Sequence, residues 1–270
     1  MPPVSPHARR RLYLVGALAL GAIAWHLVAV AVGHLRGVSF PTPLTTLSRL
    51  AELLRGRLLL NHSLFRHLAD SLVRWGAGFA IASAAGIGYG LIAGGGGARK
   101  GLTVPLVQGL QLIPGLAWIP VALLLFGINE RTTVFIIAMT VFPPVAMNVL
   151  AGVESVDTTY LRAARMLGAK GWTLTARVLL PGALPYMLGG LRIGLGNGWR
   201  VLLAAEMVVG SGTGLGYSII QARWTLDYPA AFACLLVILA VGLATEHLVF
   251  APLERWTIAR WRLGDDRRAT

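Results

Sequence analysis

The chain has 270 residues, of which 56% are hydrophobic and 13% charged, with a formal net charge of +13 at pH 7 and a mean hydropathy of +0.68. Soluble domains carry about 25% charged residues, so this composition excludes an ordinary soluble globular protein and indicates a membrane protein. No basic stretch is interleaved with aromatic residues as in single-strand binders. The positive charge therefore predicts membrane lipids, and no nucleic acid, as partners.

Six stretches have the length of about 20 residues that a helix needs to cross a bilayer. They span residues 12–33, 71–94, 102–127, 132–152, 182–210 and 229–252. The first is about twice as long as the apolar run of a signal peptide, so it is predicted as a retained span. Prolines interrupt the third and fourth stretches, at Pro114, Pro120, Pro143 and Pro144, which predicts kinked helices packed in a bundle. The predicted fold is all-α: one polytopic membrane domain, residues 1–270, with about six transmembrane helices.

Arginine and lysine are enriched in cytoplasmic segments of membrane proteins. With the amino terminus inside, the inner segments hold fourteen of these residues and the outer segments seven. The sequence thus predicts a multi-pass protein of the bacterial cytoplasmic (inner) membrane with both termini cytoplasmic. The first outer segment holds five arginines, and residues 42–72 within it are predicted as an amphipathic helix on the outer surface.

Small residues recur every four positions in two predicted spans. They are Ala82, Gly86 and Gly90 in the second span and Gly190, Gly194 and Gly198 in the fifth. This spacing lets helix backbones approach closely in lipid, so it predicts helix packing and no chemistry.

A short, basic segment, residues 154–181, lies between the fourth and fifth spans. Thr158 or Thr159 can cap a short helix that runs through Met166, and Gly168 can end it. A second short helix is predicted for about residues 172–180. The residues alone leave two interpretations open: an ordinary cytoplasmic loop, or a surface that a partner protein covers.

The same segment contains Arg162-Ala163-Ala164, then Gly168, and further on Val178, Leu180 and Pro181. This pattern resembles the cytoplasmic loop of ABC importer permeases, in which Glu-Ala-Ala is followed at the same spacings by Gly, an aliphatic residue and Leu-Pro. Arg162 departs from the family, which usually has Glu there. The flanking blocks, over residues 71–223, are similar to the permeases for taurine, alkanesulfonates and nitrate.

The resemblance implies that the segment forms coupling helices that dock on a separate ATPase. The residues implied in this coupling are Arg162, Ala163, Ala164, Arg165, Gly168, Ala169 and Pro181. It also implies two ABC ATPase subunits that bind ATP and Mg, a second copy of the permease forming a homodimer, and an extracytoplasmic substrate-binding protein. No cofactor is expected in this chain.

We expect no enzymatic activity from the chain itself. Its stretch GGGGARKG, residues 94–101, departs from a phosphate-binding loop because Arg99 replaces the glycine before Lys100 and no Ser or Thr follows. No metal site is predicted either. His62 and His67 are the only closely spaced histidines, and both are expected to be solvated.

Charged residues inside the spans point to function or to pairing, because each costs about 2.5 kcal/mol or more in lipid. Arg200 and Glu206 either pair with each other or a neighbour, or line a translocation pathway for a small anionic solute. The candidate pathway residues are Gln108, Gln111, Trp118, Asn148, Asn197, Arg200 and Glu206. Two alternatives stay open: an ion-gradient-driven carrier or channel that uses Glu206 and Glu246 for proton relay, and a structural subunit of a larger membrane complex.

Overall fold

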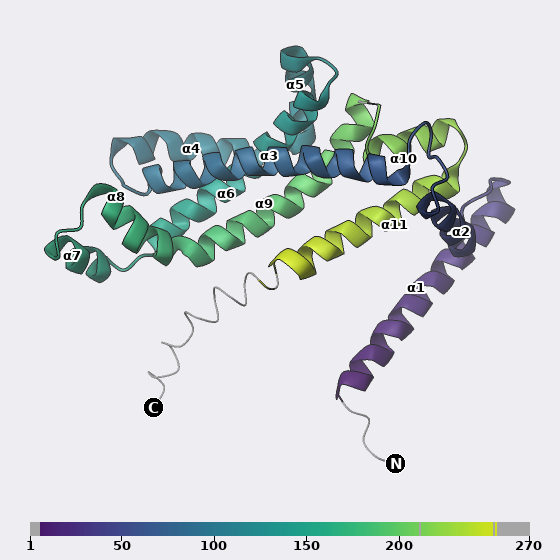
Figure 1. Cartoon of the computed structure of the whole chain (residues 1–270), viewed down its shortest axis with the longest axis horizontal. Coiled ribbons are helices and arrows are strands. Elements are labelled where there is room, and N and C mark those ends of the chain that lie inside the picture. Colours follow the sequence, from purple (N-terminus) through teal and green to yellow (C-terminus); the bar gives the residue numbers. More distant parts are fainter. Residues whose placement is uncertain (1–5, 211, 251, 253–270) are drawn as a thin grey trace. The chain divides into compact units, whose positions relative to one another are not determined.

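The computed structural model describes residues 6–210, 212–250 and 252, and that part of the chain is helical without strands (Figure 1). This confirms the predicted all-α fold. The elements are α1 (Pro6–Arg36), α2 (Pro43–Leu54), α3 (Leu64–Ala93), α4 (Ala98–Leu112), η1 (Gly115–Trp118), α5 (Ile119–Phe126), α6 (Glu130–Glu154), α7 (Thr158–Met166), α8 (Gly171–Leu174), η2 (Thr175–Leu179), α9 (Leu180–Val209), α10 (Leu215–Trp224), α11 (Tyr228–Thr245) and η3 (Glu246–Phe250).

The described residues up to Phe65 form one compact unit with Ser218–Val237. Arg66–Tyr217 and the described residues from Ile238 onward form a second unit. The single domain therefore stays a prediction. The two cytoplasmic termini also stay a prediction, because residues 1–5 and 253–270 lie outside the described residues.

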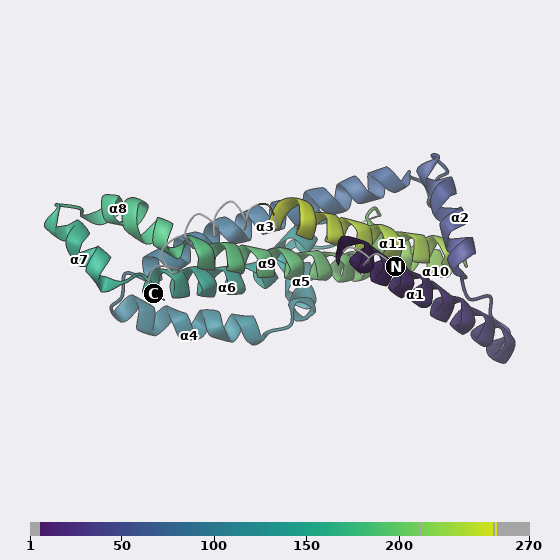
Figure 2. The ribbon, with the colours of Figure 1, turned by 90° about the horizontal axis from the view of Figure 1, so that it is seen from below.

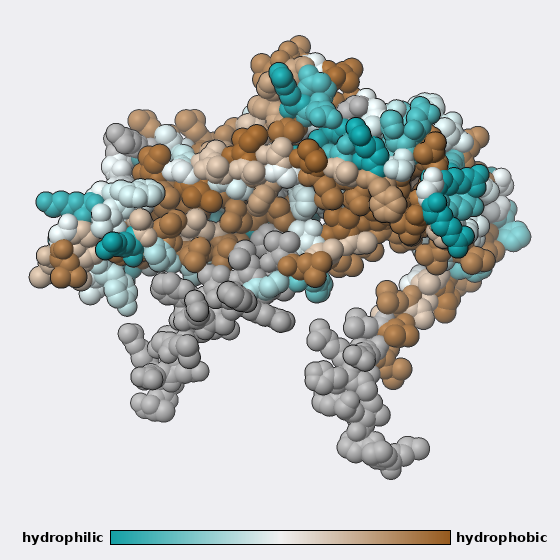
Figure 3. Space-filling model, viewed as in Figure 1, coloured by the Kyte–Doolittle hydropathy of each residue, from teal (hydrophilic) through white to brown (hydrophobic). Residues whose placement is uncertain are grey.

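Five helical stretches are long and apolar enough to cross a membrane. They are Val15–Arg36, Leu64–Ala93, Glu130–Glu154, Gly171–Val209 and Tyr228–Leu248. Apolar side chains cover much of the face seen in Figure 3, as expected of helices that face lipid. With the bent pair described next, the count reaches the predicted six.

The predicted span 102–127 is broken rather than merely kinked. The helical stretches Lys100–Leu112 and Gly115–Phe126 are bent by 101° relative to each other. Ile113, the residue before Pro114, is extended (φ −78°, ψ 120°), because a proline ring disfavours helical geometry in the preceding residue. By contrast, Pro143 and Pro144 are buried inside the continuous helix α6.

α6 and α9 run side by side at the centre of the second unit, with α3 against α6 (Figures 1 and 2). A buried ridge on α6 holds them together, made of Val141, Val145, Val149 and Val153 at every fourth position. The glycines that face this ridge or its neighbours are Gly86 and Gly90 of α3, Gly94 directly after α3, and Gly190, Gly194 and Gly198 of α9. The predicted small-residue packing is confirmed, since the glycine backbones lie directly on the side chains of α6.

The predicted amphipathic helix over residues 42–72 is wrong in its extent. Only α2 is amphipathic and separate, and it begins with a reciprocal capping box between Thr42 and Thr45. The helix ends before Gly56, whose φ of +96° is outside helical geometry, and the chain becomes helical again only at Leu64. Arg49 of α2 is held by an ion pair with Asp227 at 2.6 Å, within the first unit.

We expect Gly90→Ala to destabilise the permease fold by about 1–3 kcal/mol. A Cβ at position 90 would lie 2.6 Å from the Val149 Cβ and 2.9 Å from the backbone nitrogen of Leu150, so the helices must move apart. Thermal unfolding in detergent measures the loss. Gly88→Ala, on the same helix with nothing within 4 Å of the added methyl, is the matched control. Equal melting temperatures for the two variants would contradict the close packing of α3 on α6.

Candidate functional site

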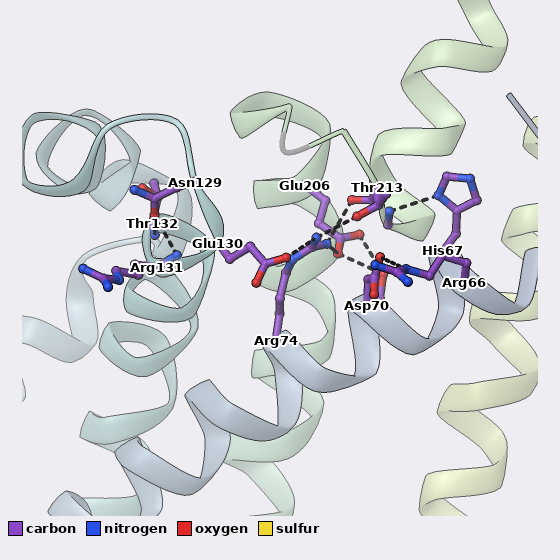
Figure 4. A network of polar contacts seen from close by, with 12 residues as sticks. Arg66, His67, Asp70, Arg74, Asn129, Glu130, Arg131, Thr132, Glu206 and Thr213 are labelled. Atoms are coloured by element: carbon purple, nitrogen blue, oxygen red, sulfur yellow. Dashed lines mark hydrogen bonds and ion pairs between the residues drawn. The ribbon is translucent and has the colours of Figure 1, made fainter. Parts of the chain in front are cut away.

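A buried ion pair joins α3 to α9 at one end of the second unit (Figure 4). Arg74 of α3 is 2% exposed and Glu206 of α9 is 0% exposed, and Arg74 Nη1 donates to Glu206 Oε1 at 2.8 Å. Breaking such a pair by removing one partner typically costs about 3–5 kcal/mol, because the other charge is left buried. The pair therefore needs further partners, and the structure supplies them.

Glu206 accepts two further hydrogen bonds besides that from Arg74. The Ser71 hydroxyl lies 2.8 and 3.0 Å from its two oxygens, and the backbone N–H of Gly216 donates to Oε2 at 2.9 Å. Arg74 in turn donates to the carbonyl and hydroxyl oxygens of Thr213, each at 2.9 Å, and to Glu130 at 3.2 Å. We call these residues, with His67, the Arg74–Glu206 cluster.

The chain after α9 closes on the cluster because it is rich in glycine. Gly210, Gly212 and Gly214 all have positive φ. A Cβ on Gly214 would lie 2.5 Å from the Glu206 carboxyl carbon, and one on Gly216 would lie 2.2 Å from the carbonyl oxygen of Leu203. Only glycine lets this loop deliver its backbone groups to Glu206.

His67 corrects one prediction, because it is fully buried rather than solvated. Its Nδ1 accepts a hydrogen bond from the backbone of Gly214 at 3.1 Å, so it helps to hold the loop. Among the residues that the structure describes, no group of three or more His, Cys, Asp or Glu side chains could hold a metal ion.

The basic segment forms α7 and α8 beyond one end of α6 and α9 (Figures 1 and 2). We call residues 154–181 the coupling segment. α7 ends as predicted, at Met166, and Gly168 has the positive φ of +85° that a helix-ending turn needs. None of the residues of α7 is buried, and Met166 and Leu167 are 87% and 90% exposed.

Two details of this segment differ from the prediction. The cap of α7 is Asp157, whose carboxylate accepts from the Thr159 backbone N–H at 2.7 Å, rather than Thr158 or Thr159. The second short helix has no break at its end. α8 continues through the π-helical turn η2 directly into α9, so residues 171–209 form one helical stretch.

The other residues predicted to couple to an ATPase also lie in residues 154–181. Arg162, Ala163, Arg165 and Gly168 are exposed, and Ala164 and Ala169 are half-buried. Pro181 lies in the first turn of α9.

Comparisons with known proteins connect this architecture to a family. Residues 86–251 match the family described as "Binding-protein-dependent transport system inner membrane component". The chain belongs to this family. A probable ABC transporter permease protein of Brucella melitensis is 37% identical over 89% of this chain and 94% of its own length.

Two further relatives are named for what they transport. The taurine transport system permease protein of Escherichia coli is 34% identical, covering 93% of this chain and 91% of that protein. The bicarbonate transport system permease protein of Synechococcus elongatus is 35% identical, covering 81% and 80%. The crystal structure of an amino acid ABC transporter with histidines has a TM-score of 0.55 at 19% identity, over 82% of this chain and 99% of the other, which supports the fold.

The protein is thus a permease subunit of an ABC importer, a multi-pass transport component rather than a catalytic one. The family does not support the ion-gradient-driven carrier. Both carboxylates of that alternative are ion-paired, Glu206 with Arg74 and Glu246 with Arg192.

The predicted pathway residues of the permease lie on α4, η1, α6 and α9. Gln108 and Gln111 are exposed on α4, and Trp118 is half-buried in η1. Asn148 is half-buried on α6 and donates to the carbonyl of Pro144 at 2.8 Å. Within the described part of the chain, only Asn197 and Arg200 among the seven are joined by a hydrogen bond, at 2.6 Å on α9.

Glu206 differs from the other pathway candidates. It pairs with a neighbour, which was one of the two interpretations of its charge, but the neighbour is Arg74 and not Arg200. Arg200 is exposed, and its place in a pathway stays a prediction. Arg74 lies within the predicted span 71–94, and the cost of a charge in lipid is the signal that could have identified it.

We expect Glu206→Leu to destabilise the permease by about 3–5 kcal/mol, because Arg74 is left buried without its main partner. The double variant Arg74→Met with Glu206→Leu should lose less than the sum of the two single variants. Denaturant unfolding in detergent gives the coupling energy. Glu246→Gln, which breaks the half-exposed pair with Arg192, is the control and should cost less than about 1 kcal/mol. Additive losses at positions 74 and 206 would contradict a coupled pair.

α7 should lose its cap at low pH. The Thr159 backbone N–H holds the pKa of Asp157 below its usual range, so the folded helix favours the ionised carboxylate. That contribution is present at neutral pH and is lost as the pH falls below about 4. Amide hydrogen exchange of α7, corrected for intrinsic rates, should accelerate there in the parent chain but not in Asp157→Asn, whose amide caps without titrating. Equal acceleration in both would contradict the assignment.

Proposed function

We propose that this permease forms part of the translocation pathway for a small anionic solute of the sulfonate, taurine or nitrate type. It receives the energy for transport through the coupling segment from two separate ATPase subunits, which bind ATP and Mg. A second, identical permease copy completes the pathway, and an extracytoplasmic binding protein delivers the solute. The chain itself needs no cofactor.

The observation that carries this proposal is the exposed surface of the coupling segment. Tyr160, Met166, Leu167 and Trp172 are large apolar side chains that are each more than two-thirds exposed. They occur beside Arg162 and Arg165 on a segment that projects beyond the ends of the long helices (Figure 1). Apolar groups gathered on a basic, water-facing segment are typical of a protein interaction surface.

The solute class rests on charge. Arg200 is exposed on α9, inside a stretch long and apolar enough to span the membrane, and Asn197 orients its guanidinium. An exposed cation at this depth is costly unless it faces a watery path or an anion. Taurine and bicarbonate, for which two relatives are named, both carry an anionic group.

The coupling segment also sets the proposed orientation. A segment that docks on an ATPase lies in the cytoplasm. Four crossings precede it when the bent pair α4–α5 counts as one crossing, and two follow it. We therefore propose cytoplasmic termini, in agreement with the arginine distribution.

We expect Leu167→Asp to abolish most of the ATP-driven uptake in proteoliposomes that hold the permease, the ATPase and the binding protein. Leu167 is 90% exposed, so the change removes docking surface and leaves the fold intact. The ATPase should no longer co-purify with the variant. Thr173→Asp, which adds the same charge at an exposed polar position of the segment, is the control and should retain uptake. Normal uptake by Leu167→Asp, or accumulation of solute by the parent permease without any ATPase, would refute the proposal.

A further inference from the structure

A hollow of about 390 Å³ opens between α3, α5 and α6, next to the Arg74–Glu206 cluster. Its size falls within the range of about 300–1,000 Å³ that is usual for ligand sites. Most of its lining is apolar, from Val73, Ala77 and Ile81 of α3, Phe126 of α5, and Val134, Phe135 and Ala138 of α6. Nothing in the transport function proposed above uses this hollow.

The polar groups of the hollow are gathered at one end. Glu130 and Arg131 belong to the first turn of α6, where Glu130 points toward Arg74 of α3 and Arg131 points away from it (Figure 4). Arg74 is engaged with Glu206 and Glu130, although its Nε is buried without a hydrogen-bond partner among the described residues. The guanidinium of Arg131 is exposed and makes no ion pair or side-chain hydrogen bond in the part of the chain that the structure describes.

The apolar part of the hollow extends along the membrane-spanning helices. Val73, Ala77 and Ile81 are spaced by four residues on α3, so they form a strip about 12 Å long. This strip lies inside the span Leu64–Ala93, and the lining residues of α6 lie inside the span Glu130–Glu154. The hollow therefore has a cation at the start of α6, at the end of a candidate span, and an apolar floor that runs along the span from there.

This arrangement distinguishes between two kinds of anionic ligand. A small hydrophilic anion, such as the transported solute, would need polar partners all around it, because an unpaired charge on an apolar wall is costly. An amphiphile needs a cation at one end only and gains free energy from each methylene that it buries on the floor. The lining matches the amphiphile.

We propose that the hollow is a phospholipid site, in which Arg131 binds the phosphate and one acyl chain lies on the strip of Val73, Ala77 and Ile81. Basic pockets between membrane helices recognise lipid headgroups in this way. The site goes beyond the transport function, and its occupancy does not depend on which solute is carried.

Native mass spectrometry of the purified importer, exchanged into defined lipid, tests the proposal. With phosphatidylglycerol as the probe, Arg131→Gln should reduce the lipid retained per permease about five-fold, the effect of one arginine near an anionic surface. Arg55→Gln, which neutralises an exposed arginine outside the hollow, should leave retention unchanged. The parent permease should retain phosphatidylglycerol more strongly than diacylglycerol, which has the acyl chains without the phosphate.

Ala77→Phe fills the floor from an exposed position, so the fold should be kept while the lipid is lost. An unchanged melting temperature verifies the fold. Retention that is equal in the parent, Arg131→Gln and Ala77→Phe would overturn the proposal, and so would equal retention of the two probes. If Ala77→Phe instead separates the permease copies at unchanged lipid retention, a second copy occupies the hollow and the proposal is also overturned.

Discussion

The Arg74–Glu206 ion pair is the interaction on which one end of the second unit depends. Two full charges are removed from water there, and their mutual attraction offsets the cost only when the remaining hydrogen-bonding groups are satisfied as well. Ser71 and the backbone of Gly216 donate to the Glu206 carboxylate, and Thr213 accepts from the two terminal nitrogens of Arg74. The Arg74 Nε alone in the pair has no hydrogen-bond partner among the described residues. The pair thereby ties α3 and α9 to the glycine-rich loop between α9 and α10. The glycines of the loop permit its close approach, and the Glu206 carboxylate anchors it through the backbone N–H of Gly216.

The valine ridge of α6 connects the end of the second unit that holds the ion pair to the end at which the coupling segment begins. Glu130, which contacts Arg74, begins α6, and the coupling segment begins at the last residue of α6, Glu154. The 25 residues of the helix separate these ends by about 36 Å. Between them, glycine backbones of α3 and α9 lie directly on valine side chains, and such close-packed interfaces transmit displacement rather than absorb it.

Local sequence patterns predicted most of the architecture. Apolar length located the spans, the four-residue spacing of small residues marked the closely packed faces of α3 and α9, and Gly168 marked the end of α7 because its backbone needs a positive φ. That α6 is the helix on which both faces pack was not predicted. The partner of Glu206 could not be predicted, since Arg74 is 132 residues away in sequence and only the fold brings the two together. The cap of α7 was misassigned because Asp157 and the two threonines after it are all good capping residues. The Arg200–Asn197 contact could have been predicted from the sequence, because residues three apart on a helix are neighbours.

The π-helical turn at Thr175–Leu179 has a geometric effect that extends well beyond its five residues. A π turn holds one residue more than an α turn, and each residue rotates an α-helix by about 100°. In the helical stretch 171–209, Trp172 is therefore rotated about the helix axis by about that angle from its position in an unbroken α-helix. A single added backbone unit thus sets the direction in which the Trp172 side of the helix faces relative to the glycine face of α9. A permease with the same side chains but an unbroken α-helix at Thr175–Leu179 would expose a different side of α8.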